Sequence, residues 1–394
     1  MKLTLMDTNI FSGDRFFAGD TSFLTDFPFS LSDAISIDGH SFSVFPGFTD
    51  VHVHFREPGF SYKETIGSGS RAAAHGGFTA VCTMPNLSPT PDSLEHLREQ
   101  LSLIERDACI DVRPFGTITC GEEGKRLSDI EALAPFVCGF SDDGRGVDDS
   151  GLMREAMERA AAVGRVISAH CEDGTAPKDS PEAEWREIER DITLASDTKV
   201  KFHVCHISTK ESVALIRDAK KSGVDITAET APHYLLLTDK TRGEGGRFKM
   251  NPPLREEADR LALVEGILDG TVDMIATDHA PHSAEEKGRG FEKSLNGVVG
   301  LETSFPTMYS HFVKTGLLSL PALIRLMSTA PADRFGIPIR GYTVFDLDTA
   351  YTVRPDEFLT MGRSSPFAGD TLYGRCVATV FDGKAVYLDP NLLK

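Results

Sequence analysis

Residues 43–55 read SVFPGFTDVHVHF, an apolar run rich in β-branched and aromatic residues that ends in alternating valine and histidine. Longer amphipathic patterns, which predict helices, separate this run from seven further runs between residues 44 and 336. The further runs lie at residues 77–84, 112–120, 135–142, 165–171, 200–208, 224–230 and 272–279. Repeated strand–helix units favour a parallel sheet, and eight units over this length predict a closed (β/α)8 barrel of the TIM type rather than an open sheet.

The helical patterns have recognisable ends, as residues 208–223 illustrate. Ser208 and Glu211 have the spacing of a capping box, and Gly223 ends the amphipathic pattern. This segment therefore predicts a helix between the sixth and seventh strands.

Both ends of the chain differ from the region between them. Residues 1–43 and 340–394 contain short, turn-rich strand patterns, and Asp382-Gly383 within CVATVFDGKAVYL (376–388) predicts a hairpin. Neither end can bury a core alone. We therefore predict that the two ends combine into one small flanking β domain, and that residues 44–339 form the barrel.

The composition predicts a soluble, cytoplasmic protein without nucleic-acid or membrane partners. The 59 acidic residues outnumber 41 basic ones and give a formal net charge of −18, which repels polyanions. Asp7, Asp14 and Arg15 interrupt the N-terminal apolar residues, so no signal peptide or spanning helix is expected there. The seven cysteines contain no CxxC pair, which favours reduced, buried thiols.

Residues able to bind metal or move protons stand where the predicted strands end. The carboxyl ends of parallel strands converge on one face of a barrel, and active sites of this fold lie there. The residues are His52, His54, Asn86, Asp142, Asp143, His170, His206 and Asp278.

Four histidines of this set predict metal binding. His52 and His54 are two positions apart in a strand, so both side chains point to the same face and can reach one cation. Imidazole pairs suit Zn²⁺, Fe²⁺, Ni²⁺ or Co²⁺. His170 and His206 fit a second metal position, whereas His203, three residues before His206, is assigned a structural role.

Carboxylates are expected to complete this site. A carboxylate between two cations would screen their repulsion, and Asp142 and Asp143 are both candidates that spacing alone does not separate. Either could instead be a turn aspartate before Gly144. Asp278 at the last strand end could accept a proton from a water molecule and deliver it to a leaving nitrogen.

A small anionic substrate would need a local basic group in so acidic a protein. Arg56, two residues after His54, could hold a carboxylate with both guanidinium nitrogens. Asn86, Asn251 and His282 could add hydrogen bonds, although a turn role fits the asparagines equally well.

Six motifs of the chain resemble those of the dihydroorotases in the amidohydrolase superfamily, in particular the longer bacterial type. The resemblance extends in order over nearly the whole chain. The motifs are residues 50–59 (DVHVHFREPG), 83–86 (TMPN), 140–144 (FSDDG), 169–172 (AHCE), 203–209 (HVCHIST) and 276–282 (ATDHAPH).

The resemblance implies reversible, zinc-dependent hydrolysis of (S)-dihydroorotate to N-carbamoyl-L-aspartate in pyrimidine biosynthesis. It implies a dinuclear centre of two Zn²⁺ per chain, with His52 and His54 on one ion and His170 and His206 on the other. Asp143 would bridge the ions, because the family's bridging aspartate precedes the fifth-strand histidine by 27 positions, as Asp143 precedes His170. The remaining implied roles are metal ligand and proton shuttle for Asp278, carboxylate binding for Arg56, Asn86 and His282, and ring binding for Asn251.

The sequence departs from relatives at residues 294–297, which read Ser-Leu-Asn-Gly where Ala-Pro-Phe-Gly is frequent. Leu295, Asn296 and Gly297 are predicted there as substrate contacts. Hydantoinases and allantoinases also resemble the chain, but they use a carboxylated lysine at the end of strand four, and residues 139–144 contain no lysine. The comparison favours a dihydroorotase over these related hydrolases.

Partners are predicted only from the resemblance. The family includes assemblies with aspartate carbamoyltransferase, so such an association and a homodimer are both candidates, as is a catalytically silent barrel that supports the transferase. Silent relatives would be expected to lose metal ligands, whereas every predicted ligand is present in this chain. The sequence therefore favours an enzyme.

Overall fold

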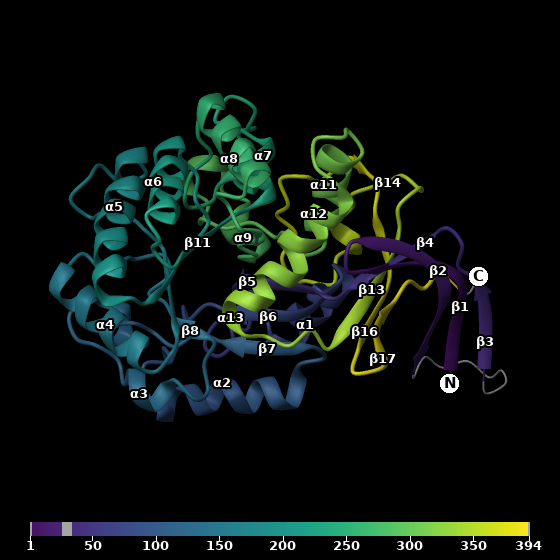
Figure 1. The fold of residues 1–394 in the computed structure, drawn as a ribbon, viewed down its shortest axis with the longest axis horizontal. Helices are drawn as coiled ribbons and strands as arrows, with labels where there is room; N and C mark the ends of the chain where they lie inside the picture. Colours follow the sequence, from purple (N-terminus) through teal and green to yellow (C-terminus); the bar gives the residue numbers. More distant parts are fainter. Residues whose placement is uncertain (1, 26–33, 393–394) are drawn as a thin grey trace.

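The computed structural model describes residues 2–25 and 34–392, and Figure 1 shows its arrangement. Eight strands lie in the central region, one at each predicted run. They are β5 (Phe48–Val53), β6 (Phe78–Thr83), β7 (Asp111–Pro114), β8 (Gly139–Phe140), β9 (Val166–Ala169), β10 (Lys201–Val204), β11 (Ile226–Thr230) and β12 (Met274–Ile275). Strand β7 begins one residue before its run. All paired neighbours among them are parallel.

The central strands follow one another in chain order. One sheet has the order β5-β6-β7 and the other β12-β11-β10-β9-β8. A parallel bridge from Gly116 to Phe140 links the end of β7 to β8, and a second from Val53 to His279 links β5 to the segment after β12. The first bridge joins the two sheets in mid-sequence, and the second brings the carboxyl ends of the first and last strands together.

Helices follow the central strands and lie outside them (Figure 1). The segment predicted to start with a capping box at Ser208 begins one residue later, because Thr209 caps the helix by accepting from the Ser212 backbone N–H. The Ser208 hydroxyl instead donates to the buried Glu184 carboxylate.

The principal helices are α1 (Ile66–His75), α2 (Leu94–Asp107), α4 (Ser150–Ala162), α5 (Pro181–Thr198), α6 (Lys210–Lys221) and α8 (Glu257–Asp269). Shorter ones are α3 (Ile130–Leu133), α7 (Pro232–Leu236), α9 (Ala284–Lys287), α10 (Gly290–Lys293), α11 (Ser304–Met308), α12 (Leu320–Ile324) and α13 (Ala330–Phe335).

The two ends of the chain share one seven-stranded sheet of order β2-β17-β16-β13-β4-β1-β3. Its strands are β1 (Lys2–Ser12), β2 (Arg15–Leu24), β3 (Ala34–Asp38), β4 (Phe42–Pro46), β13 (Gly341–Asp346), β16 (Arg375–Phe381) and β17 (Lys384–Leu388). The predicted hairpin is present, since β16 and β17 pair antiparallel and Asp382 and Gly383 have φ values of 48° and 79°. Positive φ at both central residues matches the twist of a tight hairpin. A two-stranded sheet of β14 (Tyr351–Thr352) and β15 (Thr371–Leu372) completes this region.

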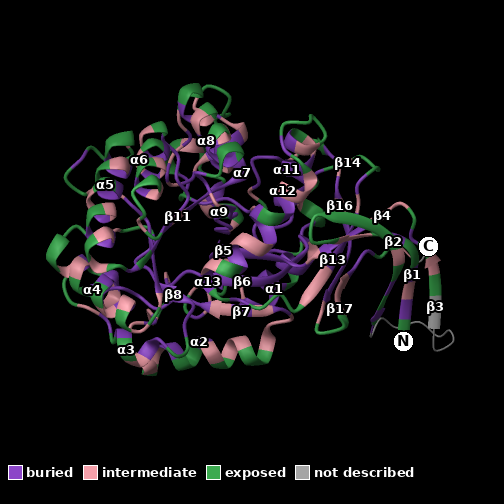
Figure 2. Ribbon diagram, viewed as in Figure 1, coloured by how far each residue is buried: buried purple, intermediate pink, exposed green. Residues whose placement is uncertain are grey.

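Aromatic packing joins the terminal sheet to the central strands. Phe305 lies 4.3 Å from Phe345 of β13 and 5.2 Å from Phe48 of β5, measured between ring centroids, and Phe45 of β4 contacts all three rings. Burial is greatest along the central strands and least on the outer helix faces (Figure 2). The seven cysteines are all free thiols. In the described part of the chain, no helix has both the length and the apolar character needed to cross a bilayer.

Candidate metal centre and substrate cavity

Six predicted metal-binding side chains come together at the carboxyl ends of the central strands. Each belongs to a different strand end except the first two, which follow one another on β5, and all six are buried. They are His52, His54, Asp143, His170, His206 and Asp278. Residues 226 positions apart in the chain thus form one cluster, as the parallel topology predicts.

Asp143 lies at the centre of the cluster. Its Oδ1 atom is 3.3 Å from His52 Nε2, 3.5 Å from His206 Nε2 and 3.9 Å from His170 Nδ1, and its Oδ2 atom is 3.5 Å from His54 Nε2. Burial alone would raise the pKa of Asp143, but the facing imidazoles, first of all His52, hold it well below its usual value. The carboxylate is therefore charged and faces imidazoles from both predicted metal positions.

Asp278 faces the first histidine pair. Its Oδ1 atom lies 3.3 Å from His54 Nε2 and 3.7 Å from His52 Nε2. The backbone φ of Asp278 is 46° and that of His206 is 31°. Residues other than glycine rarely adopt such positive φ values. Such strain persists where surrounding packing enforces it and is frequent at functional sites.

The donor atoms of the cluster fit a divalent metal centre. His52 Nε2, Asp143 Oδ1 and His206 Nδ1 are buried and have no hydrogen-bond partner. Buried polar atoms are normally satisfied, so atoms left open in this way indicate a missing partner. Two groups of three, His52–Asp143–His206 and His52–His54–Asp278, each have donor atoms within 4.8 Å of one another. Nitrogen and oxygen donors of this kind suit Zn²⁺ and similar transition metals.

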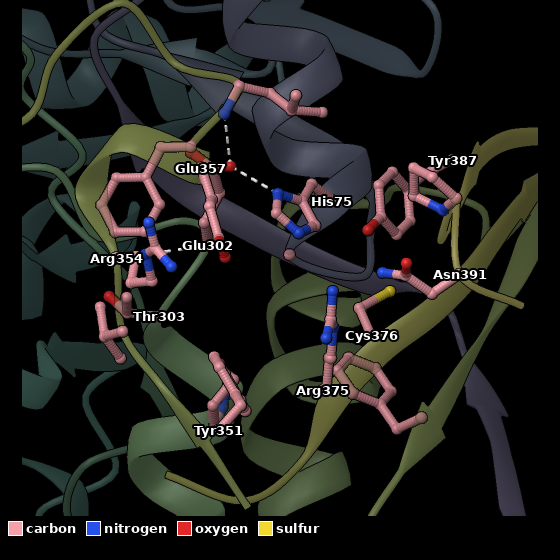
Figure 3. A pocket seen from close by; sticks show the side chains of 17 residues that line it. His75, Glu302, Thr303, Tyr351, Arg354, Glu357, Arg375, Cys376, Tyr387 and Asn391 are labelled. Atoms are coloured by element: carbon pink, nitrogen blue, oxygen red, sulfur yellow. Dashed lines mark hydrogen bonds and ion pairs between the residues drawn. The ribbon is translucent and has the colours of Figure 1, made fainter. Parts of the chain in front are cut away.

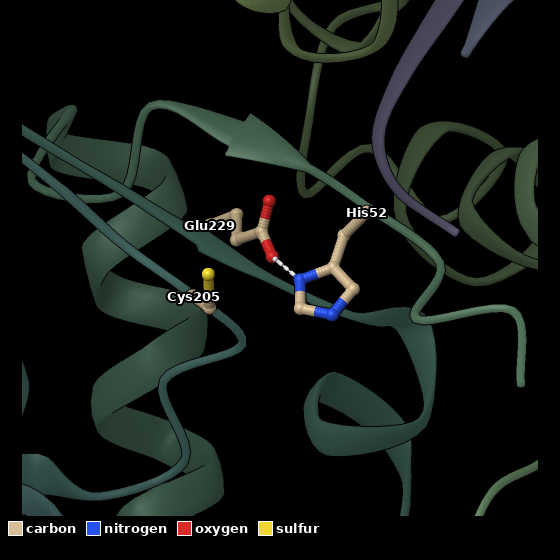
Figure 4. Close-up of side chains that lie close together, drawn as sticks. All are labelled: His52, Cys205 and Glu229. Atoms are coloured by element: carbon tan, nitrogen blue, oxygen red, sulfur yellow. Dashed lines mark hydrogen bonds and ion pairs between the residues drawn. The ribbon is translucent and has the colours of Figure 1, made fainter. Parts of the chain in front are cut away.

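Glu229, at the end of β11, orients His52 from behind (Figure 4). Its Oε1 atom lies 2.7 Å from His52 Nδ1 and its Oε2 atom 3.1 Å from His203 Nε2. Burial alone would raise the pKa of Glu229, but His52 and His203 lower it, so the carboxylate is charged. This contact fixes the ring orientation of His52 and turns its Nε2 atom toward Asp143.

His203 has the structural role that was predicted for it. Its two ring nitrogens contact Thr227 and Glu229, and it makes no contact with Asp143. Glu229 itself was not predicted. The available signal was a glutamate within the predicted strand run 224–230, because a charge buried in a strand needs a partner.

Glu172 orients His170 as Glu229 orients His52. Its Oε2 atom lies 3.2 Å from His170 Nε2 and also accepts from the side-chain amide of Asn251 at 3.2 Å. The hydrogen bond from His170 lowers the pKa of Glu172 to about 2. The predicted ring-binding residue Asn251 is therefore tied to the metal cluster through this glutamate.

Asp142 and Asp143 have different surroundings, which separates the two candidates. The Asp142 carboxylate accepts from the backbone N–H groups of Ile118 and Thr119 and from the Thr119 hydroxyl. Burial raises the pKa of Asp142 to about 6. Asp142 thus fixes the chain after β7, while Asp143 alone faces the histidines.

A cavity of about 250 Å³ opens beside the cluster, and Arg56, Asn86, Asn251, Asn296 and Gly297 line it. No lysine is among the described residues that line this cavity. The Asn86 amide donates to the Asp143 carbonyl at 2.6 Å, and its Oδ1 atom is buried without a partner. In this orientation the open atom of Asn86 is an acceptor, which fits a substrate N–H better than the predicted carboxylate.

His282 lies behind the cavity wall instead of lining it. Its Nε2 atom donates to the Asn296 carbonyl at 2.7 Å, and its Nδ1 atom lies 3.1 Å from Lys63 Nζ. Burial, followed by the charges of Arg56 and Lys63, lowers the pKa of His282 to about 3. Both ring nitrogens are occupied, so direct carboxylate binding by His282, as predicted from the sequence, does not match this geometry. Its neutral ring positions Asn296.

Lys287 joins the two loops that carry the predicted substrate contacts. Its buried Nζ atom donates to the Lys249 carbonyl at 3.0 Å and to the Leu295 carbonyl at 2.7 Å. The Gly297 N–H donates to the same Lys249 carbonyl. Leu295 itself is 41% exposed, so only its backbone takes part. No local pattern in the sequence indicates this role for Lys287.

The parallel strands and the cluster at their carboxyl ends are those of an amidohydrolase. Among solved structures, L-hydantoinase (dihydropyrimidinase) from Arthrobacter aurescens is 25% identical, with a TM-score of 0.84 over 98% of this chain and 96% of that one. D-Hydantoinase from a Thermus species is 24% identical, with a TM-score of 0.83 over 98% and 95%.

Sequence relatives identify the family within this class. Residues 43–184 match a family model described as dihydro-orotase-like. Curated dihydroorotases of Fusobacterium nucleatum and Bacillus subtilis are 46% and 44% identical over 385 residues, 91% of this chain in both cases and 91% and 90% of the relatives. The chain belongs to the dihydroorotase family.

Proposed function

We propose that this enzyme is a zinc-dependent dihydroorotase that reversibly hydrolyses (S)-dihydroorotate to N-carbamoyl-L-aspartate in pyrimidine biosynthesis. The observation that carries the proposal is the buried cluster around Asp143, whose open donor atoms adjoin a cavity that contains Arg56. A guanidinium in the cavity provides the cation that an acidic substrate needs in a protein of net charge −18.

The proposed metal centre contains two Zn²⁺ ions. His52 and His54 would hold one ion, His170 and His206 the other, with Asp143 between them and Asp278 on the first. Two such ions would polarise the ring amide carbonyl and acidify a water molecule. Glu229 and Glu172 contact the outer ring nitrogens of His52 and His170, so that the inner nitrogens face the cluster, where His170 Nδ1 lies 3.0 Å from His206 Nε2.

Asp278 is the proposed proton carrier. Burial would raise its pKa, but His54 and His52 lower it, so its carboxylate is ready to accept a proton. It would take the proton of the attacking water and return it to the ring nitrogen as the amide bond breaks. The same residue then serves as base and acid in one turnover.

The cavity residues orient the ring in this proposal. Arg56 binds the substrate carboxylate, and the open oxygen of Asn86 accepts a ring N–H. Asn251 and the backbone of Asn296 and Gly297 contact the rest of the ring, with His282 and Lys287 holding these groups in place.

The central strands are proposed to form a closed (β/α)8 barrel within residues 44–339. The bridges from Gly116 to Phe140 and from Val53 to His279 support closure at both junctions between the sheets. Residues 1–43 and 340–394 are proposed as one β domain. Strand β4 (Phe42–Pro46) crosses the predicted boundary between residues 43 and 44.

A cytoplasmic location, a homodimer and association with aspartate carbamoyltransferase remain predictions. Light scattering with and without the transferase tests the last two.

Substrate profiling tests the function directly. Zinc-loaded enzyme is expected to consume dihydroorotate, followed by its ultraviolet absorbance, and to hydrolyse dihydrouracil, hydantoin and allantoin far more slowly. Arg56→Gln should remove most of this preference because it deletes the cation that binds the carboxylate. Faster hydrolysis of the neutral rings by the unmodified enzyme would assign it to the hydantoinase activity instead.

A further inference from the structure

A second cavity, of about 420 Å³, lies between the end of α1 and the C-terminal strands (Figure 3). His75 of α1, Glu302, Tyr351 of β14, Arg375 of β16 and Tyr387 of β17 contribute to its lining. It shares no lining residue with the substrate cavity. Its size is within the range of pockets that bind small molecules.

The acidic group in this second cavity has no free capacity for a cation. Both Glu302 oxygens accept hydrogen bonds, from His75 Nδ1 at 2.6 Å, the Leu359 N–H at 2.7 Å and the Thr360 N–H at 3.2 Å. A carboxylate satisfied by three donors is a poor metal ligand. Cys376 does not change this, because burial raises the pKa of its thiol to about 12.

Donors without a partner converge on the interior of the second cavity. The hydroxyl of Tyr387 and the terminal guanidinium nitrogens of Arg375 make no hydrogen bond with the described residues, and Arg375 contacts Asp389 only through Nε, at 3.1 Å. Figure 3 shows the Arg375 guanidinium and one His75 ring nitrogen directed toward the same space. The Arg375 cation and the Tyr387 hydroxyl are thus open to a ligand in the second cavity, whereas His75 donates through Nδ1 to Glu302.

Aromatic and apolar surfaces form the remaining walls. The Tyr387 ring lies 4.5 Å from the His75 ring at an interplanar angle of 31°. Phe345, Phe358 and Pro306 face the cavity from other elements. A planar ring fits such walls, and an acceptor group on it would reach the donors.

We propose that this second cavity binds a small aromatic anion, with its ring between Tyr387 and Phe358 and its charged group on the Arg375 guanidinium and the Tyr387 hydroxyl. The guanidinium supplies a local attraction that the net charge of −18 otherwise denies to anions. The ligand class is defined by this chemistry and does not depend on the activity proposed for the metal centre.

Calorimetry on the metal-loaded, full-length enzyme tests the proposal with 1-naphthalenesulfonate as the probe. We expect saturable binding of one probe per chain, and about tenfold weaker binding of both 1-naphthol and methanesulfonate, which lack the charge or the ring. Arg375→Gln should weaken probe binding about tenfold, and Tyr387→Phe, which keeps the ring, should weaken it by a few-fold. Arg15→Gln, at an arginine side chain 86% exposed, is the matched control and should bind like the unmodified enzyme.

Three results would overturn the proposal. The first is no binding at millimolar probe, and the second is equal binding by Tyr387→Phe and the unmodified enzyme. The third is loss of binding in Arg56→Gln, which would locate the probe in the substrate cavity. Thermal unfolding of each variant verifies folding, and a crystal soaked with the probe provides a direct readout if Arg375→Gln does not fold.

Discussion

Two cavities of this protein combine histidine with carboxylate side chains, but they use these groups differently. Around Asp143, buried nitrogen and oxygen atoms of three residues lack partners and face one another. In the second cavity, Glu302 binds His75 directly and its remaining capacity is used by two backbone N–H groups. The same residue types thus form a candidate metal centre in one place and a closed hydrogen-bonded pair in the other.

The difference arises from the residues behind the imidazoles. Glu229 and Glu172 bind the outer nitrogens of His52 and His170, so the inner nitrogens turn toward Asp143. Among the described residues no second carboxylate contacts His75, whose Nδ1 atom donates to the cavity carboxylate itself. A metal centre therefore depends on partners outside the ligand set, which orient the ligands and leave their lone pairs open.

Asp278→Asn should give the largest effect in the metal cluster. The amide cannot carry the proton from water to the leaving nitrogen, so kcat is expected to fall by roughly 10³-fold or more, while the zinc content stays near that of the unmodified enzyme. Steady-state kinetics and elemental analysis measure the two quantities. Asp14→Asn, at an aspartate side chain 83% exposed, is the control and should leave both unchanged. Normal turnover in Asp278→Asn would remove this residue from the proposed mechanism.

Glu229→Gln and Glu302→Gln test the contrast between the two cavities. Loss of the Glu229 charge weakens the orientation of His52, and zinc affinity is expected to fall about 10- to 100-fold. The same change at Glu302 should leave zinc affinity unaltered, because its carboxylate accepts from His75, Leu359 and Thr360 and contacts none of the six predicted metal ligands. Competition with a zinc chelator measures both affinities. Equal losses in the two variants would show that the effect is general destabilisation.

Lys287→Met should give a smaller effect, confined to substrate binding. The change removes two hydrogen bonds that hold the loops of Asn251 and Gly297 together, and KM is expected to rise about 3- to 10-fold with kcat affected less. Lys293→Met, at an exposed lysine of α10 in the same loop, is a matched control and should leave KM unchanged. A fall in kcat without a change in KM would contradict the positioning role.

The sequence could predict the metal cluster because its residues stand at the ends of regular apolar runs. Topology then determines that His52, His170 and Asp278 meet, whatever their separation in the chain. The sequence could not predict the roles of Glu172 and Lys287. Each of them contacts a loop that is distant in the chain, and no periodic pattern indicates which loops lie close together. Spacing alone likewise left Asp142 and Asp143 open, and only the family resemblance favoured Asp143; in the structure the Ile118–Thr119 backbone binds the Asp142 carboxylate, which leaves Asp143 to the histidines.

The pH dependence of stability at Lys287 should give the smallest effect. Burial, with the nearby charge of Lys249, lowers the pKa of Lys287 from 10.5 to about 7 in the folded state. Between these values the unfolded chain binds the proton and the folded chain does not, so this residue makes the free energy of unfolding increase as pH rises from about 7 to about 10. Thermal unfolding should therefore show the melting temperature of the unmodified enzyme rising relative to that of Lys287→Met by about 1–3 °C over this range. Because both proteins are measured at each pH, the contributions of other titrating groups to the melting temperature cancel. A difference in melting temperature that is constant with pH would mean that Lys287 stays protonated in the folded enzyme and holds the loops as an ammonium ion.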